Sequence, residues 1–108
     1  MIQAMEIPAS DDGRMKREDS DPKAKEAYSA FGVIPGVGKS ISLDLWDLGM
    51  RSLDDVAQGD PELMFEVTKE LAGGQMDRCI LYVYRCAVAF ANDPNIDSEL
   101  RKWWNWKD

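Results

Sequence analysis

The chain has 108 residues, 44% of them apolar, which is enough for one small domain with its own core. Its 13 basic and 20 acidic side chains give a net charge of −7, which repels nucleic acid at long range and argues against a general DNA coat protein. It has no histidine, so the usual general base at neutral pH and the commonest transition-metal ligand are both absent. Hydrolytic and zinc chemistry are therefore not expected, and any contact with phosphate must be local.

Residues 1–20 mix charges with Ser, Gly and Pro and have neither a helical nor an alternating apolar period. We interpret them as a flexible leader before a single domain over residues 21–108. The N-terminus has no apolar stretch of signal-peptide type, and the longest apolar run, residues 79–91, is too short to span a bilayer. We expect a cytoplasmic protein with no membrane contact.

The first two predicted helices flank a glycine-containing turn. Asp21-Pro22 suits the start of a helix over residues 23–31, whose core face would be Ala27, Tyr28 and Phe31. A second helix is predicted over residues 39–48, because Ile41, Leu45 and Leu48 recur at helical spacing, and Gly49 suits its end.

Four further elements follow in the sequence. Ser52 and Asp55 predict the capping box of a short helix. A helix starting at Asp60-Pro61 would end at Gly73-Gly74, and its predicted buried side is Leu63, Met64, Val67 and Leu71. Residues 76–91 are apolar almost all round and predict the central helix, and Asp97-Ser98 can cap a last turn or two. No run demands a strand, so we expect an all-α bundle of about five or six short helices.

The predicted central helix contains both cysteines, Cys79 and Cys86. At about 1.5 Å of rise per residue, their Cα atoms are about 10 Å apart, whereas a disulfide needs less than about 7 Å. We expect two small buried thiols on one helix face, in a reducing compartment.

The segment Ile34-Pro35-Gly36-Val37-Gly38-Lys39 is the clearest candidate site. A tight turn here would leave the first amides of the next helix without internal partners, and the helix dipole favours an anion there. From residue 27 to residue 42 there is no Asp or Glu, and Lys39 is the only charge. The predicted phosphate-binding residues are Gly36, Val37, Gly38, Lys39 and Ser40. The alternative is that the turn only joins two packed helices and is apolar because it is partly buried.

This turn, together with the following Leu48-Gly49-Met50 and Ser52-Leu53, resembles the helix-hairpin-helix motif of DNA repair and recombination proteins. Residues 81–88 and the terminal residues 102–108 are similar to the small bacterial "pathogenicity locus" family, sometimes called putative mitomycin-resistance proteins. The resemblance covers about residue 28 to the end. It implies a small SAM-like helical fold that binds the DNA backbone without sequence specificity.

The resemblance carries two further implications and one departure. The hairpin carbonyls, here those of Gly32, Ile34 and Val37, can hold a monovalent cation that bridges to a phosphate. The segment around residues 72–75 would be a degenerate second hairpin that pairs with the first, as paired hairpins do on duplex DNA in repair proteins. Asp44 and Asp47 depart from the pattern, because many DNA-binding relatives carry Lys or Arg there.

The C-terminal tail concentrates three of the four tryptophans, Trp103, Trp104 and Trp106. Trp103 and Trp106 can fold back onto the core and fix the terminus. Alternatively, the tail is an exposed aromatic contact that stacks on unpaired bases or fills a pocket on a partner. Adjacent Trp103 and Trp104 point in different directions on a helix, so we expect one of them to stay partly exposed.

Two hypotheses of different classes follow. The first is a non-enzymatic domain that binds DNA backbone weakly and serves as an accessory to a repair or stress pathway. The second is an acidic protein-interaction module that keeps the hairpin as scaffold and uses the tryptophan tail or the acidic helix that starts at Asp60-Pro61 to hold a partner or to dimerise. We expect a monomer rather than a dimer, no cofactor beyond the cation at the hairpin, and no enzymatic activity, because no nucleophile–base pair is visible.

Overall fold

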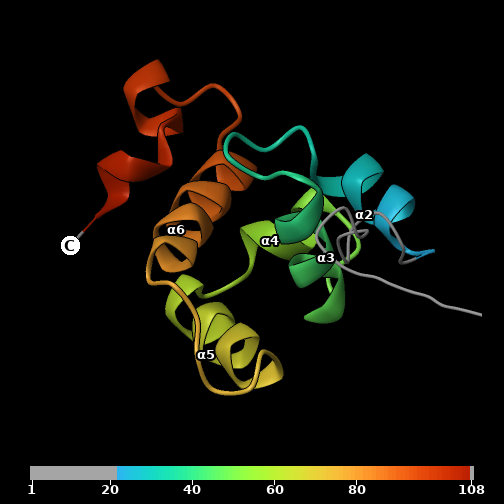
Figure 1. Ribbon diagram of the computed structural model, residues 1–108. Coiled ribbons are helices and arrows are strands. Elements are labelled where there is room, and N and C mark those ends of the chain that lie inside the picture. The colour runs from blue at the N-terminus through green and yellow to red at the C-terminus, as the bar shows by residue number, and fades with distance from the viewer. Residues whose placement is uncertain (1–21, 108) are drawn as a thin grey trace, which may run out of the picture.

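The computed structural model describes residues 22–107, which form only helices and connecting turns (Figure 1). In chain order the elements are α2 (Ala24–Phe31), α3 (Lys39–Asp47), α4 (Leu53–Ala57), α5 (Pro61–Leu71), α6 (Cys79–Asn92), η2 (Ser98–Arg101) and η3 (Trp103–Trp106), the last two being 3-10 helices. The predicted all-α class is confirmed. The leader predicted at residues 1–20 lies outside the described residues.

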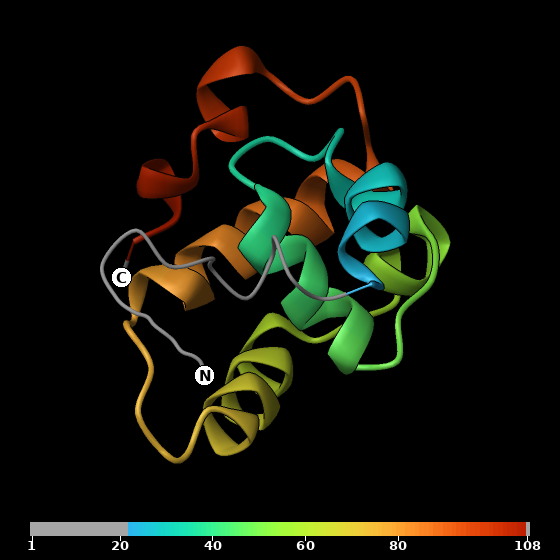
Figure 2. The same cartoon turned by 45° about the vertical axis from the view of Figure 1, so that its right-hand side comes forward.

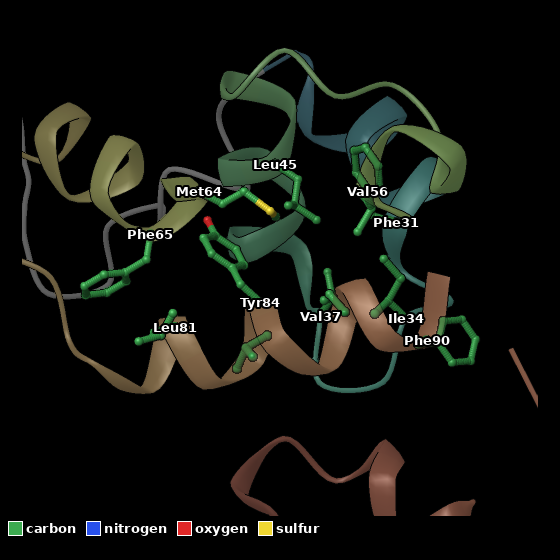
Figure 3. Close-up of a cluster of buried hydrophobic side chains, with 12 residues drawn as sticks. Phe31, Ile34, Val37, Leu45, Val56, Met64, Phe65, Leu81, Tyr84 and Phe90 are labelled. Atoms are coloured by element: carbon green, nitrogen blue, oxygen red, sulfur yellow. The ribbon is translucent and has the colours of Figure 1, made fainter. Parts of the chain in front are cut away.

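Helix α6 is the centre of the domain, as its apolar sequence predicts. Helices α4 and α5 and the C-terminal η3 pack against it, whereas α3 packs chiefly along α2. Figure 3 shows side chains from α2, α3, α4 and α5 converging on α6, among them Phe31, Leu45, Val56 and Phe65. The helix starts at Cys79 rather than Met76, with Arg78 as its N-cap residue, and the Asp77 carboxylate accepts the backbone N–H of Cys79 (2.9 Å) at this start.

Helix α5 buries only one of its four predicted core residues, Met64. Its buried residues are Met64, Phe65 and Thr68, whereas Leu63, Val67 and Leu71 are 62%, 39% and 63% exposed. The prediction failed because it counted only apolar residues. The Thr68 hydroxyl forms a buried hydrogen bond with that of Tyr84 on α6 (2.8 Å), so a polar residue belongs to the core face and the helix is rotated accordingly.

The predicted core face of α2 also needs one correction. Ala27 and Phe31 are fully buried, but Tyr28 is 43% exposed and Ala24 is buried instead. The helix starts at Ala24, with Lys23 as its N-cap residue and no side-chain cap. Asp21, the predicted cap, lies outside the described residues.

Other predicted helix boundaries are confirmed. Gly49 has φ +94° directly after α3, and the Ser52 hydroxyl accepts the N–H of Asp55 (3.3 Å) at the start of α4. The Asp55 carboxylate accepts the backbone N–H of Arg51 (2.8 Å) and not that of Ser52. The second hydrogen bond of the predicted capping box therefore involves the residue before Ser52. Asp60 caps α5. Within residues 22–107, no helix is long and apolar enough to cross a bilayer.

Candidate nucleic-acid interface

Residues 32–38, which we call the glycine turn, reverse the chain between α2 and α3. The carbonyl of Ile34 accepts the N–H of Val37 (3.1 Å), with Pro35 next in the chain and Gly36 at φ +83°. Pro at the second position and positive φ at the third define a type II turn, which explains this order of residues. Ile34 and Val37 are buried, so the turn is fixed to the core from beneath while its glycines stay on the surface.

The exposed side of the glycine turn presents backbone donors. Helix α3 starts at Lys39 with Gly38 as its N-cap residue and without a side-chain cap. Within residues 22–107, the amides of Gly36, Gly38 and Lys39 have no hydrogen-bond acceptor. Such amides at the positive end of a helix dipole form a site for an anion.

Gly38 has no conformational reason to be glycine. Its φ is −94°, which any residue can adopt, and the positive φ of this turn occurs at Gly36 instead. A Cβ added at Gly38 would meet nothing within 4 Å. The missing side chain leaves open space above the first turn of α3, into which another molecule can approach the backbone closely.

The charges near the turn favour an anion more than the sequence of α3 suggests. Lys39 is exposed and forms no ion pair within the described residues. The carboxylates of Asp44 and Asp47 line a hollow between α3 and α5. Asp47 also lies 3.8 Å from Nζ of Lys23. These carboxylates therefore belong to a different surface from that of the turn amides.

The three carbonyls predicted to hold a monovalent cation come from this one turn. The Ile34 carbonyl already accepts one hydrogen bond, from Val37, and keeps a second lone pair. Gly32 is required sterically, because a Cβ there would lie 2.7 Å from Cε1 and from the carbonyl oxygen of Tyr28. A cation at Gly32, Ile34 and Val37 stays a prediction.

The tryptophan tail lies beside the glycine turn (Figure 2). The indole of Trp103 packs against Gly36 and the core, and a Cβ added to Gly36 would lie 3.0 Å from its Cδ1. Trp104 meets Trp103 edge to face, with ring centroids 5.7 Å apart, and is 50% exposed. Trp106 is partly buried and donates its indole N–H to the Leu100 carbonyl (2.9 Å). Trp103 thus packs onto the core as predicted and Trp104 is the ring that stays exposed, whereas a contact of the tail with a base or a partner stays a prediction.

Arg85 joins the tail to the bundle, a role that the sequence did not reveal. Its guanidinium donates to the Trp106 carbonyl (2.9 Å) and pairs with the Glu62 carboxylate of α5 (2.9 Å). Glu62 and Trp106 are 23 residues before and 21 residues after Arg85, so no local sequence signal marks this contact.

The segment between α5 and α6 is not a second copy of the glycine turn. Gly73 and Gly74 have φ +92° and +97°, but their N–H groups donate to the carbonyls of Glu70 (3.1 Å) and Lys69 (2.8 Å). These bonds close the C-terminus of α5. Because its glycine amides are used within the chain, this segment offers less to a phosphate than the first turn does.

The cysteines lack the features of nucleophiles. A hydrogen bond to Asp77 raises the pKa of the Cys79 thiol, and burial raises the pKa of the Cys86 thiol, so both stay protonated at neutral pH. The Asp77 carboxyl accepts the backbone N–H of Cys79, which lowers its pKa. Both cysteines are free; Cys86 is buried as predicted, whereas Cys79 is only partly buried because it begins α6. The described residues include no group of three or more His, Cys, Asp or Glu that could hold a metal.

Comparison with known proteins gives one result at the level of the family. Searches of curated proteins and of solved structures find no match. A model of the pathogenicity locus family, Cdd1, matches residues 24–108, which begin with α2 and include every described helix. The chain therefore belongs to the pathogenicity locus family.

Proposed function

We propose that α2, the glycine turn and α3 form a helix-hairpin-helix motif that binds the nucleic-acid backbone weakly and without sequence specificity. The observation that carries this proposal is the set of exposed amides at Gly36, Gly38 and Lys39 without an acceptor in the described chain. They lie in a stretch without carboxylates, and the absence of a side chain at Gly38 leaves them open to a phosphate.

The net charge of −7 sets the expected strength of binding. Long-range repulsion opposes the approach of DNA, so affinity depends on a few short contacts at the turn. With about two to four phosphates contacted, the affinity should fall steeply with salt, with a log–log slope of about −2 to −4. DNA is the proposed ligand, and a monovalent cation at the turn carbonyls would strengthen the contact with phosphate.

Trp104 extends this proposed site toward bases. It is 50% exposed and stands edge to face on Trp103, which itself lies against Gly36. A phosphate at the turn would bring the adjoining nucleotide of a single strand near this ring, and stacking on an aromatic side chain contributes about 1–3 kcal/mol per base. A protein with this function would serve as an accessory in DNA repair or stress response, in keeping with the mitomycin-resistance name used for similar proteins.

Fluorescence anisotropy with a labelled short duplex tests this proposal through two charge-matched variants. Lys39→Glu and Lys25→Glu each change the net charge by −2, so they alter long-range repulsion equally. Lys39 begins α3 at the turn, whereas Lys25 is an exposed residue of α2. Lys39→Glu should weaken binding at least about tenfold more than Lys25→Glu does. Equal weakening, or no binding of the unaltered protein at low salt, would overturn the proposal.

A further inference from the structure

Two hollows lie along α5, one beside α3 and the other beside the turn that follows α3, and we call them together the α3–α5 groove. One end is a hollow of about 330 Å³ lined by Leu48, Met50, Leu63 and Val67, among others. The other end is a smaller hollow of about 80 Å³ whose lining includes Asp44, Asp47 and Leu71. Figures 1 and 2 both show α5 beside the C-terminal end of α3.

The α5 wall of this groove is an apolar stripe that the core does not cover. Leu63, Val67 and Leu71 follow one another at every fourth residue, so they lie on one face of α5, and they are 62%, 39% and 63% exposed. Scattered exposed apolar residues are ordinary, but three in register beside a hollow form a contiguous patch. In Figure 3, Met64 points from the same helix toward Leu45 and Tyr84. The core side of α5 is therefore filled by side chains other than those of the stripe.

The described charged residues that line the groove are acidic, and Lys23 lies 3.8 Å from one of them, Asp47. Asp44 and Asp47 line its α3 side, and Asp60 lines the wider end. Glu66 and Glu70 are exposed on α5 next to the apolar stripe. No Lys or Arg is among the described residues that line the two hollows. The groove therefore combines an apolar wall with acidic edges.

We propose that the α3–α5 groove binds a basic amphipathic helix of a partner protein. The apolar face of such a helix would cover Leu63, Val67 and Leu71, and its lysines or arginines would face the carboxylates of α3 and α5. This is the helix-in-groove mode of recognition, in which apolar anchors at helical spacing supply affinity and charges orient the ligand. The stripe from Leu63 to Leu71 is about 12 Å long, enough for two turns of a bound helix.

Charge complementarity favours a basic partner helix over two other occupants of the groove, a second copy of the chain and residues 1–20. A second copy of the chain would bring Glu66 and Glu70 of both copies together, at a net charge of −7 each. Residues 1–20 contain five acidic and three basic side chains, so the net charge of this segment is also negative and does not complement the acidic edges of the groove. This inference does not depend on the proposed binding of DNA, because the groove and the glycine turn share no residues.

Fluorescence titration with a labelled peptide of leucine and lysine tests the proposal. A peptide of about 14 residues with leucines at helical spacing spans about 21 Å. It should bind the full chain with a Kd of about 10 μM, more weakly as salt rises. The same peptide with lysines replaced by glutamates should not bind. Equal binding of the two peptides, or none up to about 100 μM, would overturn the proposal.

Variants then locate the site. Leu63→Ser combined with Leu71→Ser should weaken binding at least about tenfold, since burying one leucine contributes about 1.5–3 kcal/mol. Both side chains are exposed, so the fold should persist, as circular dichroism would verify. Val33→Ser removes a 64% exposed side chain on the glycine turn and should leave peptide affinity unchanged. If both sets of variants bind equally, the peptide does not occupy the groove.

A second measurement separates the partner from a second copy. Sedimentation of the protein alone should give a monomer, and methyl NMR signals of Leu63, Val67 and Leu71 should shift only when the leucine–lysine peptide is added. A concentration-dependent dimer that shifts the same methyl signals without peptide would contradict the proposal, because the groove would then be a self-association surface.

Discussion

Trp103 in the tail packs against Gly36 in the glycine turn, 67 residues earlier in the sequence, and thereby joins the two segments with the strongest sequence signals. The contact is close, since a Cβ added to Gly36 would lie 3.0 Å from Cδ1 of the indole. The Cδ1 side of the indole thus lies against the turn, while the amides of Gly38 and Lys39 at the start of α3 have no acceptor within residues 22–107.

Substituting the two turn glycines by alanine should have unequal effects. Gly36→Ala places a side chain at φ +83° and against Trp103, so it should lower the free energy of unfolding by about 2–3 kcal/mol. Gly38→Ala, at φ −94° and facing open space, should lower it by less than about 1 kcal/mol. Urea unfolding measures both. Similar losses would show that the geometry of the turn is not as described.

The adjacent tryptophans should contribute differently to stability. Trp103 packs on the core, so Trp103→Ala should cost about 2–4 kcal/mol. Trp104 is 50% exposed, and Trp104→Ala should cost less than about 1 kcal/mol. The same denaturation experiment decides this, and a larger loss for Trp104 would reverse the assignment of anchor and exposed ring. Trp104→Ala is therefore also the suitable variant for testing base stacking in a folded protein.

The buried hydrogen bond between Thr68 and Tyr84 gives a test of the α5 face. Tyr84→Phe leaves the Thr68 hydroxyl without its partner and should cost about 1–2 kcal/mol. Adding Thr68→Val removes the unpaired hydroxyl and should recover part of this loss. A purely additive effect in thermal or urea unfolding would mean that the two hydroxyls do not interact in solution.

Removing Arg85 should loosen the tail. Arg85→Met eliminates the hydrogen bond to the Trp106 carbonyl, so hydrogen exchange of the Trp106 indole N–H should accelerate. Glu62→Gln serves as the control, because it removes the charge of a carboxylate whose side chain is 59% exposed and leaves the bond to the tail intact. This variant should change exchange and stability little, since exposed ion pairs contribute about 0–1 kcal/mol. Equal acceleration in both variants would mean that the ion pair, not the carbonyl contact, holds the tail.

The sequence predicts the helices well where local chemistry sets them. Gly49, Ser52 and Asp60 start or end helices through their own backbone or side-chain geometry, so their positions follow from residue type alone. The type II turn at Pro35 and Gly36 follows in the same way. The start of α6 differs from the apolar pattern that begins at Met76, and there the Asp77 carboxylate accepts the backbone N–H of Cys79.

The sequence does not predict features that depend on contacts between distant residues. An apolar count cannot show that Thr68 faces the core, because its partner Tyr84 is on another helix. The error concealed the exposed stripe of Leu63, Val67 and Leu71, and with it the groove. The tail shows the same limit, since the partners of Trp103 and Arg85 are far away in sequence. The unpaired amides of Gly38 and Lys39 could be predicted, because helix geometry leaves the first N–H groups of a helix without partners.

The most direct test of backbone binding is an amide-resolved NMR titration with a short duplex and a short single strand, at low and then moderate salt. Binding at the turn predicts shifts at Gly36, Gly38, Lys39 and Ser40 that diminish as salt rises, with movement of the Trp104 indole signal for the single strand only. If these amides do not move at about millimolar nucleic acid, or if the shifts fall on α5 instead, the glycine turn is scaffold and the central claim is contradicted.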